Sequence, residues 1–238
     1  FLFFLSEGLS EYSAVALLAK EKGEKQLRKF LKYELDQYLE GRAFEQKYEP
    51  SIIQAEGQSY IHYNKAGLTM YTLSDFIGKD IFNKALGNFI EKYRYKSDPY
   101  PNIGQFINSI RRESPEDLQY LITDTFEKIT LYENKAISAS AILNSDSTYT
   151  VDLEVEAKKV YSDSLGIQTN AELNDWLEIG ILGEFLINGK IEELPIYLEK
   201  VFITDSITAF QVNVKEKPVK AGIDPMNKFV DRDSDDNL

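Results

Sequence analysis

The sequence predicts an α+β protein, in which helices fill the first half of the chain and strands the second. Up to about residue 127, apolar side chains recur every three to four residues, the period of an amphipathic helix. Beyond that point apolar and polar residues alternate, the period of a half-buried strand. We therefore expect an all-helical segment over residues 1–127 and an antiparallel β-sandwich over residues 128–238, ending in an acidic tail.

Composition narrows the class of protein. The chain has 238 residues, of which 43% are hydrophobic, so it can bury a globular core. Its formal net charge of −12 argues against a nucleic-acid partner. It has no cysteine, which excludes disulfides and a thiol nucleophile and is compatible with either side of a membrane. No apolar stretch reaches the roughly 20 residues that span a bilayer, so we expect a soluble domain.

Glycine and proline divide the helical half. The first helix is expected to end at Lys22, and the second to run from Glu24 to Gly41. Two more are expected, one that follows Gly67 and runs to Gly78 and one over residues 79–95, and a shorter one follows Pro101. Ser114 and Pro115 have the chemistry of a helix start, so a last helix is expected to open there.

Turn residues divide the second half. Ala136–Ile142 and Tyr149–Ala157 alternate on either side of a polar turn and are expected to form a hairpin. Later strands are expected at Trp176–Phe185, Ile196–Ile203 and Thr208–Val214. The acidic tail from Asp231 resembles the start of a calcium loop without its glycine and later glutamate, so a solvated tail is the expected state.

The first helix carries the first candidate site. Glu7 and Glu11 are four positions apart and therefore project from the same side of a helix. Such carboxylates can bind a metal, but they also complement the helix dipole in an ordinary first turn. His62 is the sole histidine of the sequence, so no second histidine is available to pair with it as a ligand.

Leu5–Tyr12 resembles the Leu-x-Glu-Gly-x-Ala-x-Tyr segment of the M1 family of zinc metallopeptidases (gluzincins, aminopeptidase N-like). The resemblance implies that Glu7 is the third protein ligand of a catalytic zinc. Within it, Glu11 either accepts a hydrogen bond from an upstream histidine and orients it, or lies on a solvated helix face. In that family two histidines of an H-E-x-x-H helix shortly upstream supply the other ligands. This chain lacks that motif and begins on Phe1 rather than methionine, so we expect it to be a C-terminal fragment of a longer protein.

A second segment, Tyr63-Asn64-Lys65, resembles the family's Tyr-x-Lys-Gly. The resemblance implies that Tyr63 donates a hydrogen bond to the tetrahedral intermediate of peptide hydrolysis. The sequence departs from the pattern at Ala66, where the family has glycine, and Gly67 follows one position late.

Other parts of the chain extend the resemblance. Residues 173–180, 221–225 and 230–232 are similar to bacterial family members in which a peptidase-like region follows an ABC transporter permease. Their expected role is structural. The resemblance implies a parent that is associated with a bacterial inner membrane, on a side that the sequence does not give.

The expected function is therefore peptide-bond hydrolysis by zinc-activated water in the intact parent, with Tyr63 as the catalytic residue and Glu7 as the metal ligand. The isolated chain is expected to be inactive and not to retain zinc, because a single carboxylate does not hold it. Tyr60 either braces Tyr63 or only packs. The alternative is a peptidase-shaped scaffold of a transporter, without chemistry. An exposed apolar Phe1–Leu5 end is expected to favour self-association.

Overall fold

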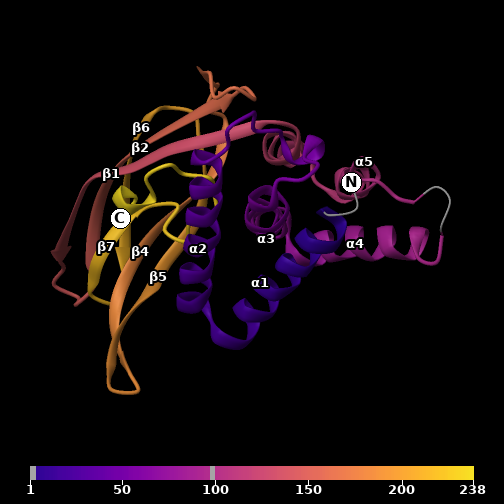
Figure 1. Cartoon of the computed structure of the whole chain (residues 1–238). Coiled ribbons are helices and arrows are strands. Elements are labelled where there is room, and N and C mark those ends of the chain that lie inside the picture. The colour runs from indigo at the N-terminus through magenta and orange to yellow at the C-terminus, as the bar shows by residue number, and fades with distance from the viewer. Residues whose placement is uncertain (1–3, 97–99) are drawn as a thin grey trace. The chain divides into compact units, whose positions relative to one another are not determined.

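The computed structural model of the chain describes residues 4–96 and 100–238, and it confirms the α+β class. Helices precede strands along the chain, and the change falls between Glu127 and Ile129. Two compact units are formed. The first comprises residues 1–17, 33–130 and 161–168, and the second comprises residues 18–32, 131–160 and 169–238. Each is described separately below (Figure 1).

The helical part consists of α-helices joined by short 3₁₀ and π turns. Among the described residues, none of the helices has the length and apolar character needed to cross a membrane. The α-helices are α1 (Leu9–Lys22), α2 (Glu24–Ala43), α3 (Ala66–Ile77), α4 (Lys79–Tyr93), α5 (Ile103–Glu113) and α6 (Gln119–Ile122). The π turns are η1 (Phe4–Gly8), η3 (Ile61–Lys65) and η5 (Thr123–Glu127), and the 3₁₀ turns are η2 (Ile52–Gln54) and η4 (Glu116–Leu118). A further 3₁₀ turn, η6 (Ser234–Asp236), follows the strands near the C-terminus.

Aromatic packing forms the centre of the first unit. The rings of Phe4 and Phe126 meet edge to face with centroids 5.7 Å apart, and Phe106 lies 6.0 Å from Phe4. Phe4 is 1% exposed, so the expectation of an exposed apolar end is wrong for this residue. Phe1–Phe3 lie outside the described residues, and self-association through the chain start stays a prediction there.

Ser114 does not open a helix, contrary to the prediction. It ends α5, and its hydroxyl donates to the Ile110 carbonyl over 2.7 Å. The chain then makes the 3₁₀ turn η4 before the single turn of α6 begins at Gln119. A serine hydroxyl can bond the carbonyl four residues earlier as readily as it caps a following helix, and the sequence pattern does not distinguish the two.

The strands form two antiparallel sheets in the β-rich half. In the first, the order is β1 (Ile129–Leu143), β2 (Tyr149–Ser162) and β3 (Gln168–Asn170), and β6 (Ile207–Val214) also pairs with β2. In the second, β4 (Asp175–Ile187) lies between β5 (Lys190–Ile203) and β7 (Pro218–Ile223). Opposite residues of β2 and β6 include Leu153 and Phe210.

The predicted hairpin is confirmed as β1 and β2, but β1 begins earlier than expected. Its first part, Ile129–Tyr132, is buried without alternation, so the period of two was not visible in the sequence there. β5 also begins before its predicted start at Ile196, and it is joined to β4 by a turn at Asn188 and Gly189. β3 and β7 were not predicted, because each is short.

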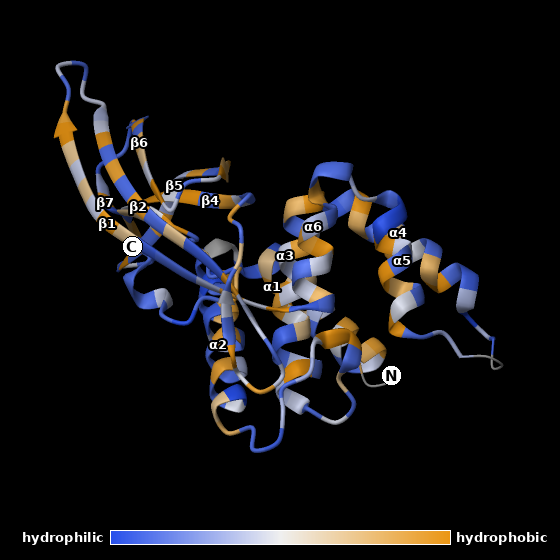
Figure 2. Cartoon of the chain, turned by 90° about the horizontal axis from the view of Figure 1, so that it is seen from above, coloured by the Kyte–Doolittle hydropathy of each residue, from blue (hydrophilic) through white to orange (hydrophobic). Residues whose placement is uncertain are grey.

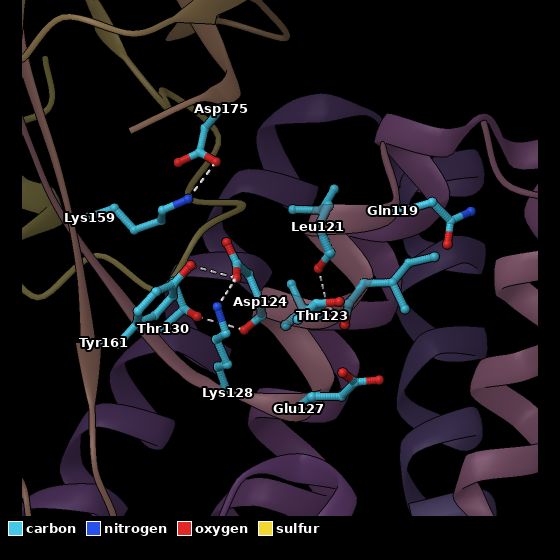
Figure 3. Close-up of polar contacts among 12 residues, drawn as sticks. Gln119, Leu121, Thr123, Asp124, Glu127, Lys128, Thr130, Lys159, Tyr161 and Asp175 are labelled. Atoms are coloured by element: carbon cyan, nitrogen blue, oxygen red, sulfur yellow. Dashed lines mark hydrogen bonds and ion pairs between the residues drawn. The ribbon is translucent and has the colours of Figure 1, made fainter. Parts of the chain in front are cut away.

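A polar cluster ties the end of the helical part to the strands within the first unit. Asp124 is 3% exposed, and it accepts a hydrogen bond of 2.9 Å from the Tyr161 hydroxyl (Figure 3). The ammonium of Lys128 lies 3.5 Å from the same carboxylate and 3.8 Å from the centre of the Tyr161 ring. The Asp124 carbonyl also accepts from Thr130 over 2.7 Å. These contacts hold the turn from η5 into β1.

Candidate functional site

Both segments that carry the candidate residues are π-helical turns. Glu7 lies in η1, immediately before α1, and Tyr63 lies in η3, immediately before α3. A π turn widens the helix by one residue and so re-aims the side chains that it carries, and such turns are frequent at functional sites. The two turns belong to the first unit.

Two glycines let these turns approach each other closely. A Cβ atom on Gly8 would lie 3.0 Å from the Cβ of Ala66, and one on Gly67 would lie 2.9 Å from the Cβ of Glu11. Both distances are tighter than ordinary packing allows, so each position favours glycine. Close packing against Glu11 therefore explains why residue 67 is a glycine, although it lies one position after the glycine of the family pattern.

The close packing brings Glu7 and Tyr63 together, although they are 56 positions apart in the sequence (63 − 7). The Glu7 carboxylate lies near enough to the Tyr63 hydroxyl to raise the pKa of Tyr63 above its ordinary value, as an acceptor and through its charge. The charges of Glu7 and Glu11 act in the same direction. Tyr63 is 39% exposed, so its hydroxyl is a neutral donor that solvent or a ligand can reach.

Glu34 and Asn64 join the same group of side chains, and sequence reasoning missed them. Glu34 is 2% exposed, and it accepts a hydrogen bond of 2.7 Å from the Asn64 amide. Burial raises the pKa of Glu34, and the charge of Glu11 adds to this. The available signal was a glutamate among the apolar positions of α2, at Leu31, Glu34 and Leu35.

Tyr60 belongs to a different cluster of the same unit. Its ring lies 6.0 Å from that of Tyr38, and its hydroxyl donates to Glu45 over 3.4 Å. Burial, followed by the charges of Glu49 and Glu45, raises the pKa of Tyr60. A Cβ on Gly41 would lie 2.4 Å from the Cβ of Tyr60, so Tyr60 packs tightly on α2.

Lys65 is at the buried centre of that cluster. Its ammonium donates to the Tyr38 hydroxyl over 3.0 Å and lies 3.7 Å from Glu49. Burial lowers the pKa of Lys65 to about 8, against the attraction of Glu49. Glu49 also accepts from the Tyr38 hydroxyl and, over 2.5 Å, from Arg42. The lysine of the Tyr-x-Lys segment is therefore a core residue that fixes the turn carrying Tyr63.

His62 is turned into the protein. It is 3% exposed, and burial lowers the pKa of its imidazole. The described residues contain no group of three or more His, Asp or Glu side chains placed to hold a metal ion. Glu7 is therefore one candidate ligand, and the part of the chain that the structure describes does not make up a zinc site by itself.

The motifs of the second half meet in one place in the second unit. A Cβ on Gly180 would lie 2.4 Å from Pro225, and one on Gly222 would lie 1.7 Å from the carbonyl oxygen of Asn237. The ammonium of Lys228 pairs with Glu178 over 2.7 Å, and both residues are buried. We refer to Glu178, Gly180, Gly222, Asp224, Pro225 and Lys228 as the β4–β7 cluster.

Asp224 organises the loop of this cluster. It is fully buried, and its carboxylate accepts from the backbone N–H groups of Lys228 and Phe229 over 2.9 and 3.0 Å. Burial raises the pKa of Asp224 to about 8. Its own N–H donates to the Glu178 carbonyl over 2.7 Å. These contacts give the residues of the β4–β7 cluster a structural role, because they fix the loop backbone and allow close packing.

The acidic tail returns along β1. Asp231 is fully buried and accepts from the N–H of Asn134 over 2.9 Å and from the N–H of Asp233 over 3.1 Å. Burial raises the pKa of Asp231 to about 6. Lys135 pairs with Asp236 over 3.2 Å. The predicted solvated tail is wrong for Asp231, because this carboxylate serves as a backbone acceptor in the core.

No family model matches the sequence, and no curated protein matches it either.

Proposed function

We propose that this chain contributes part of the active site of an M1-like zinc metallopeptidase, with Tyr63 as a catalytic hydrogen-bond donor and Glu7 as a metal ligand. The observation that carries the proposal is the close packing of the turn with Glu7 on the turn with Tyr63, at Gly8 and Ala66, which brings together two motif segments distant in sequence. A neutral tyrosine hydroxyl that a ligand can reach is a suitable donor to the oxyanion of peptide hydrolysis. The substrate class is a peptide.

The two histidines and the general-base glutamate of such a site would come from polypeptide outside this sequence. Glu11 would then accept a hydrogen bond from one of these histidines and orient it toward the metal. The isolated chain would have no turnover, because metal affinity depends on converging ligands.

The test uses the full-length protein that contains this chain. We expect zinc to be bound in a 1:1 ratio and peptides to be cleaved, and Glu7→Gln to lose most of both. Tyr63→Phe should keep zinc and lose activity by roughly 100-fold or more, the usual effect of removing one oxyanion donor. Glu56→Gln, an exposed glutamate of the same unit, is the matched control and should change neither.

A second candidate is a peptidase-shaped scaffold of a membrane transporter. The buried core around Lys65 favours it, because this network stabilises the fold whether or not Tyr63 performs chemistry. A folded full-length protein that binds no zinc and cleaves no peptide would leave this second candidate and reject the first.

A further inference from the structure

The outer edge of β1 has a guarded part, which the C-terminal segment covers, and an unguarded part, which no described segment covers. β1 is the end strand of its sheet, so one edge has no neighbouring strand among the described residues. At the start of β1 the C-terminal segment covers this edge. Tyr132 donates to the Val230 carbonyl over 2.8 Å and accepts from the N–H of Arg232 over 3.2 Å, in a parallel bridge with Asp231. Beyond Asn134 the described residues provide no such cover.

The unguarded part, Ala136–Leu143, is unusually free of charge. This chain has 28% charged residues, yet residues 136–145 contain none. Ile137, Ile142 and Leu143 are 42%, 61% and 61% exposed. Figure 2 shows β1 as the outermost strand, with a hydrophobic end. An exposed edge with β-forming, uncharged residues is a template for pairing with another strand.

The edge of the other sheet shows the contrast. β5 is also an end strand, but it carries Glu192, Glu193, Glu199 and Lys200 together with Pro195. Charged side chains and proline on an edge prevent strand pairing between molecules. The chain thus guards one edge in the usual way and leaves the outer part of β1 without such residues.

The hairpin turn shows which backbone groups face outward. The N–H of Asn144 donates to the Thr148 carbonyl over 2.8 Å, so Asn144 faces β2. Counted back from Asn144 along a regular strand, the backbone groups of Leu143, Ala141 and Ala139 alternate toward the open edge. The N–H groups of Tyr132 and Asn134 bond to the C-terminal segment and so point away from β2, although these residues lie an even number of positions from Asn144, which faces β2. The alternation therefore shifts by one residue between Asn134 and Asn144.

A second copy of the same strand fits this edge. Antiparallel pairing about a twofold axis at Ser140 sets Ala139 opposite Ala141 and Ile137 opposite Leu143, with small serines meeting at the axis. Such isologous pairs of apolar and small side chains stabilise neighbouring strands.

Charge favours the same arrangement. In this register Lys135 of each copy, which also pairs with Asp236 of its own chain, lies beside the hairpin turn of the other copy, and this turn carries Asp146, so opposite charges flank the paired segment. We propose that Ala136–Leu143 is a strand-pairing surface through which two copies of this chain form a twofold-symmetric antiparallel dimer. This surface is separate from the Glu7–Tyr63 site, and the proposal does not depend on the proposed function.

Sedimentation tests the dimer. A single strand pair buries less than the roughly 1,000 Å² of a stable interface, so association should be weak. From about 1 to 300 µM, the mass of the chain should rise from 27.3 kDa toward twice that value. Ala141→Pro removes an outward N–H without removing a bond to β2, and Ala139→Lys adds an edge charge; both should remain monomeric.

Gln26→Lys, with the same charge change at an exposed position of α2, should still dimerise. Deletion of residues 1–3 should leave the dimer intact, which separates this surface from association through the chain start. A wild-type monomer over the whole range would overturn the proposal. So would growth beyond the dimer, because head-to-tail pairing does not close.

Hydrogen exchange gives a readout that does not need a variant. With rising concentration, exchange of the Ala139, Ala141 and Leu143 amides should slow at least about tenfold, in step with the mass. The Ile142 amide faces β2 and should change little. Dimerisation without added protection at these three amides would place the interface elsewhere and overturn the proposal.

Discussion

The Glu7–Tyr63 site and the β4–β7 cluster both gather carboxylates, but in opposite settings. In the β4–β7 cluster both carboxylates are buried. Glu178 pairs with the Lys228 ammonium, and Asp224 accepts hydrogen bonds from backbone N–H groups. In the Glu7–Tyr63 site the tyrosine is 39% exposed, and the nearby negative charges raise its pKa. The first setting is that of a structural element, and the second leaves groups accessible to a ligand.

The comparison teaches how to separate architecture from chemistry among similar motifs. A buried charge with its partners is costly to disturb, and its loss should appear as lost stability. A half-exposed carboxylate near a tyrosine contributes little to stability, so its loss should appear in titration or activity. Substitutions in the two regions should therefore give different readouts.

The largest effect is expected for Lys228→Met. This change leaves the Glu178 carboxylate buried without its ion-pair partner, which costs about 3–5 kcal/mol. Urea unfolding followed by circular dichroism measures the loss. The double variant Glu178→Leu, Lys228→Met removes both charges and should recover most of the stability. A loss below about 1 kcal/mol in the single variant would contradict the structural reading of this pair.

Gly222→Ala should have the next largest effect. Its Cβ would lie 1.7 Å from the Asn237 carbonyl oxygen, so the backbone must move, at a cost of about 1–3 kcal/mol. Gly57→Ala is the matched control, because nothing lies within 4 Å of a Cβ there. Its unfolding free energy should change by less than about 1 kcal/mol. Equal effects in both variants would contradict the close approach at Gly222.

Local patterns predicted much of the fold, whereas contacts between distant residues were not predictable. The alternation in Tyr149–Ala157 predicted β2, and the apolar spacing of α4 predicted that helix, because each period is a property of the segment alone. The buried start of β1 and the early start of β5 were missed, since burial on both faces or an irregular pattern hides the period.

The candidate site was predictable in part. Glu7, Glu11 and Tyr63 were selected from motif resemblance. The negative charges of Glu7 and Glu11 raise the pKa of Tyr63, and the roles of all three residues stay a prediction. Glu34 and Asn64 were missed because their pairing joins α2 to η3 across 30 positions (64 − 34), which no local pattern records. Burial of Lys65 was also missed, because lysine is usually a surface residue.

The next largest effect is expected in the pH dependence of the unfolding free energy. The pKa of Asp224 is raised to about 8 in the folded state, above its value near 4 when unfolded. Between these values the folded state holds the extra proton, so the unfolding free energy should fall as pH rises from about 5 to 8. Asp231, with a pKa raised to about 6, acts in the same direction. Urea unfolding at several pH values measures the slope.

Asp224→Asn is the comparison for that slope, because asparagine keeps the shape but cannot titrate. The decline of unfolding free energy with pH should be shallower in this variant. Asp152→Asn, at an exposed position of β2, should keep the wild-type slope. Identical slopes in all three proteins would show that Asp224 does not retain its proton.

The smallest effect on stability, and the most informative for function, is expected for Glu7→Gln. Removing the carboxylate removes the main cause that raises the pKa of Tyr63, so the titration midpoint of this tyrosine should fall toward its ordinary value. Stability should change by less than about 0.5 kcal/mol, because the pair is near the surface. NMR of ring-labelled tyrosine, with Tyr63→Phe to assign the signal, measures the midpoint. Glu56→Gln should leave it unchanged. If Glu7→Gln also leaves it unchanged, the two residues do not interact in solution, and the main support for a shared active site is lost.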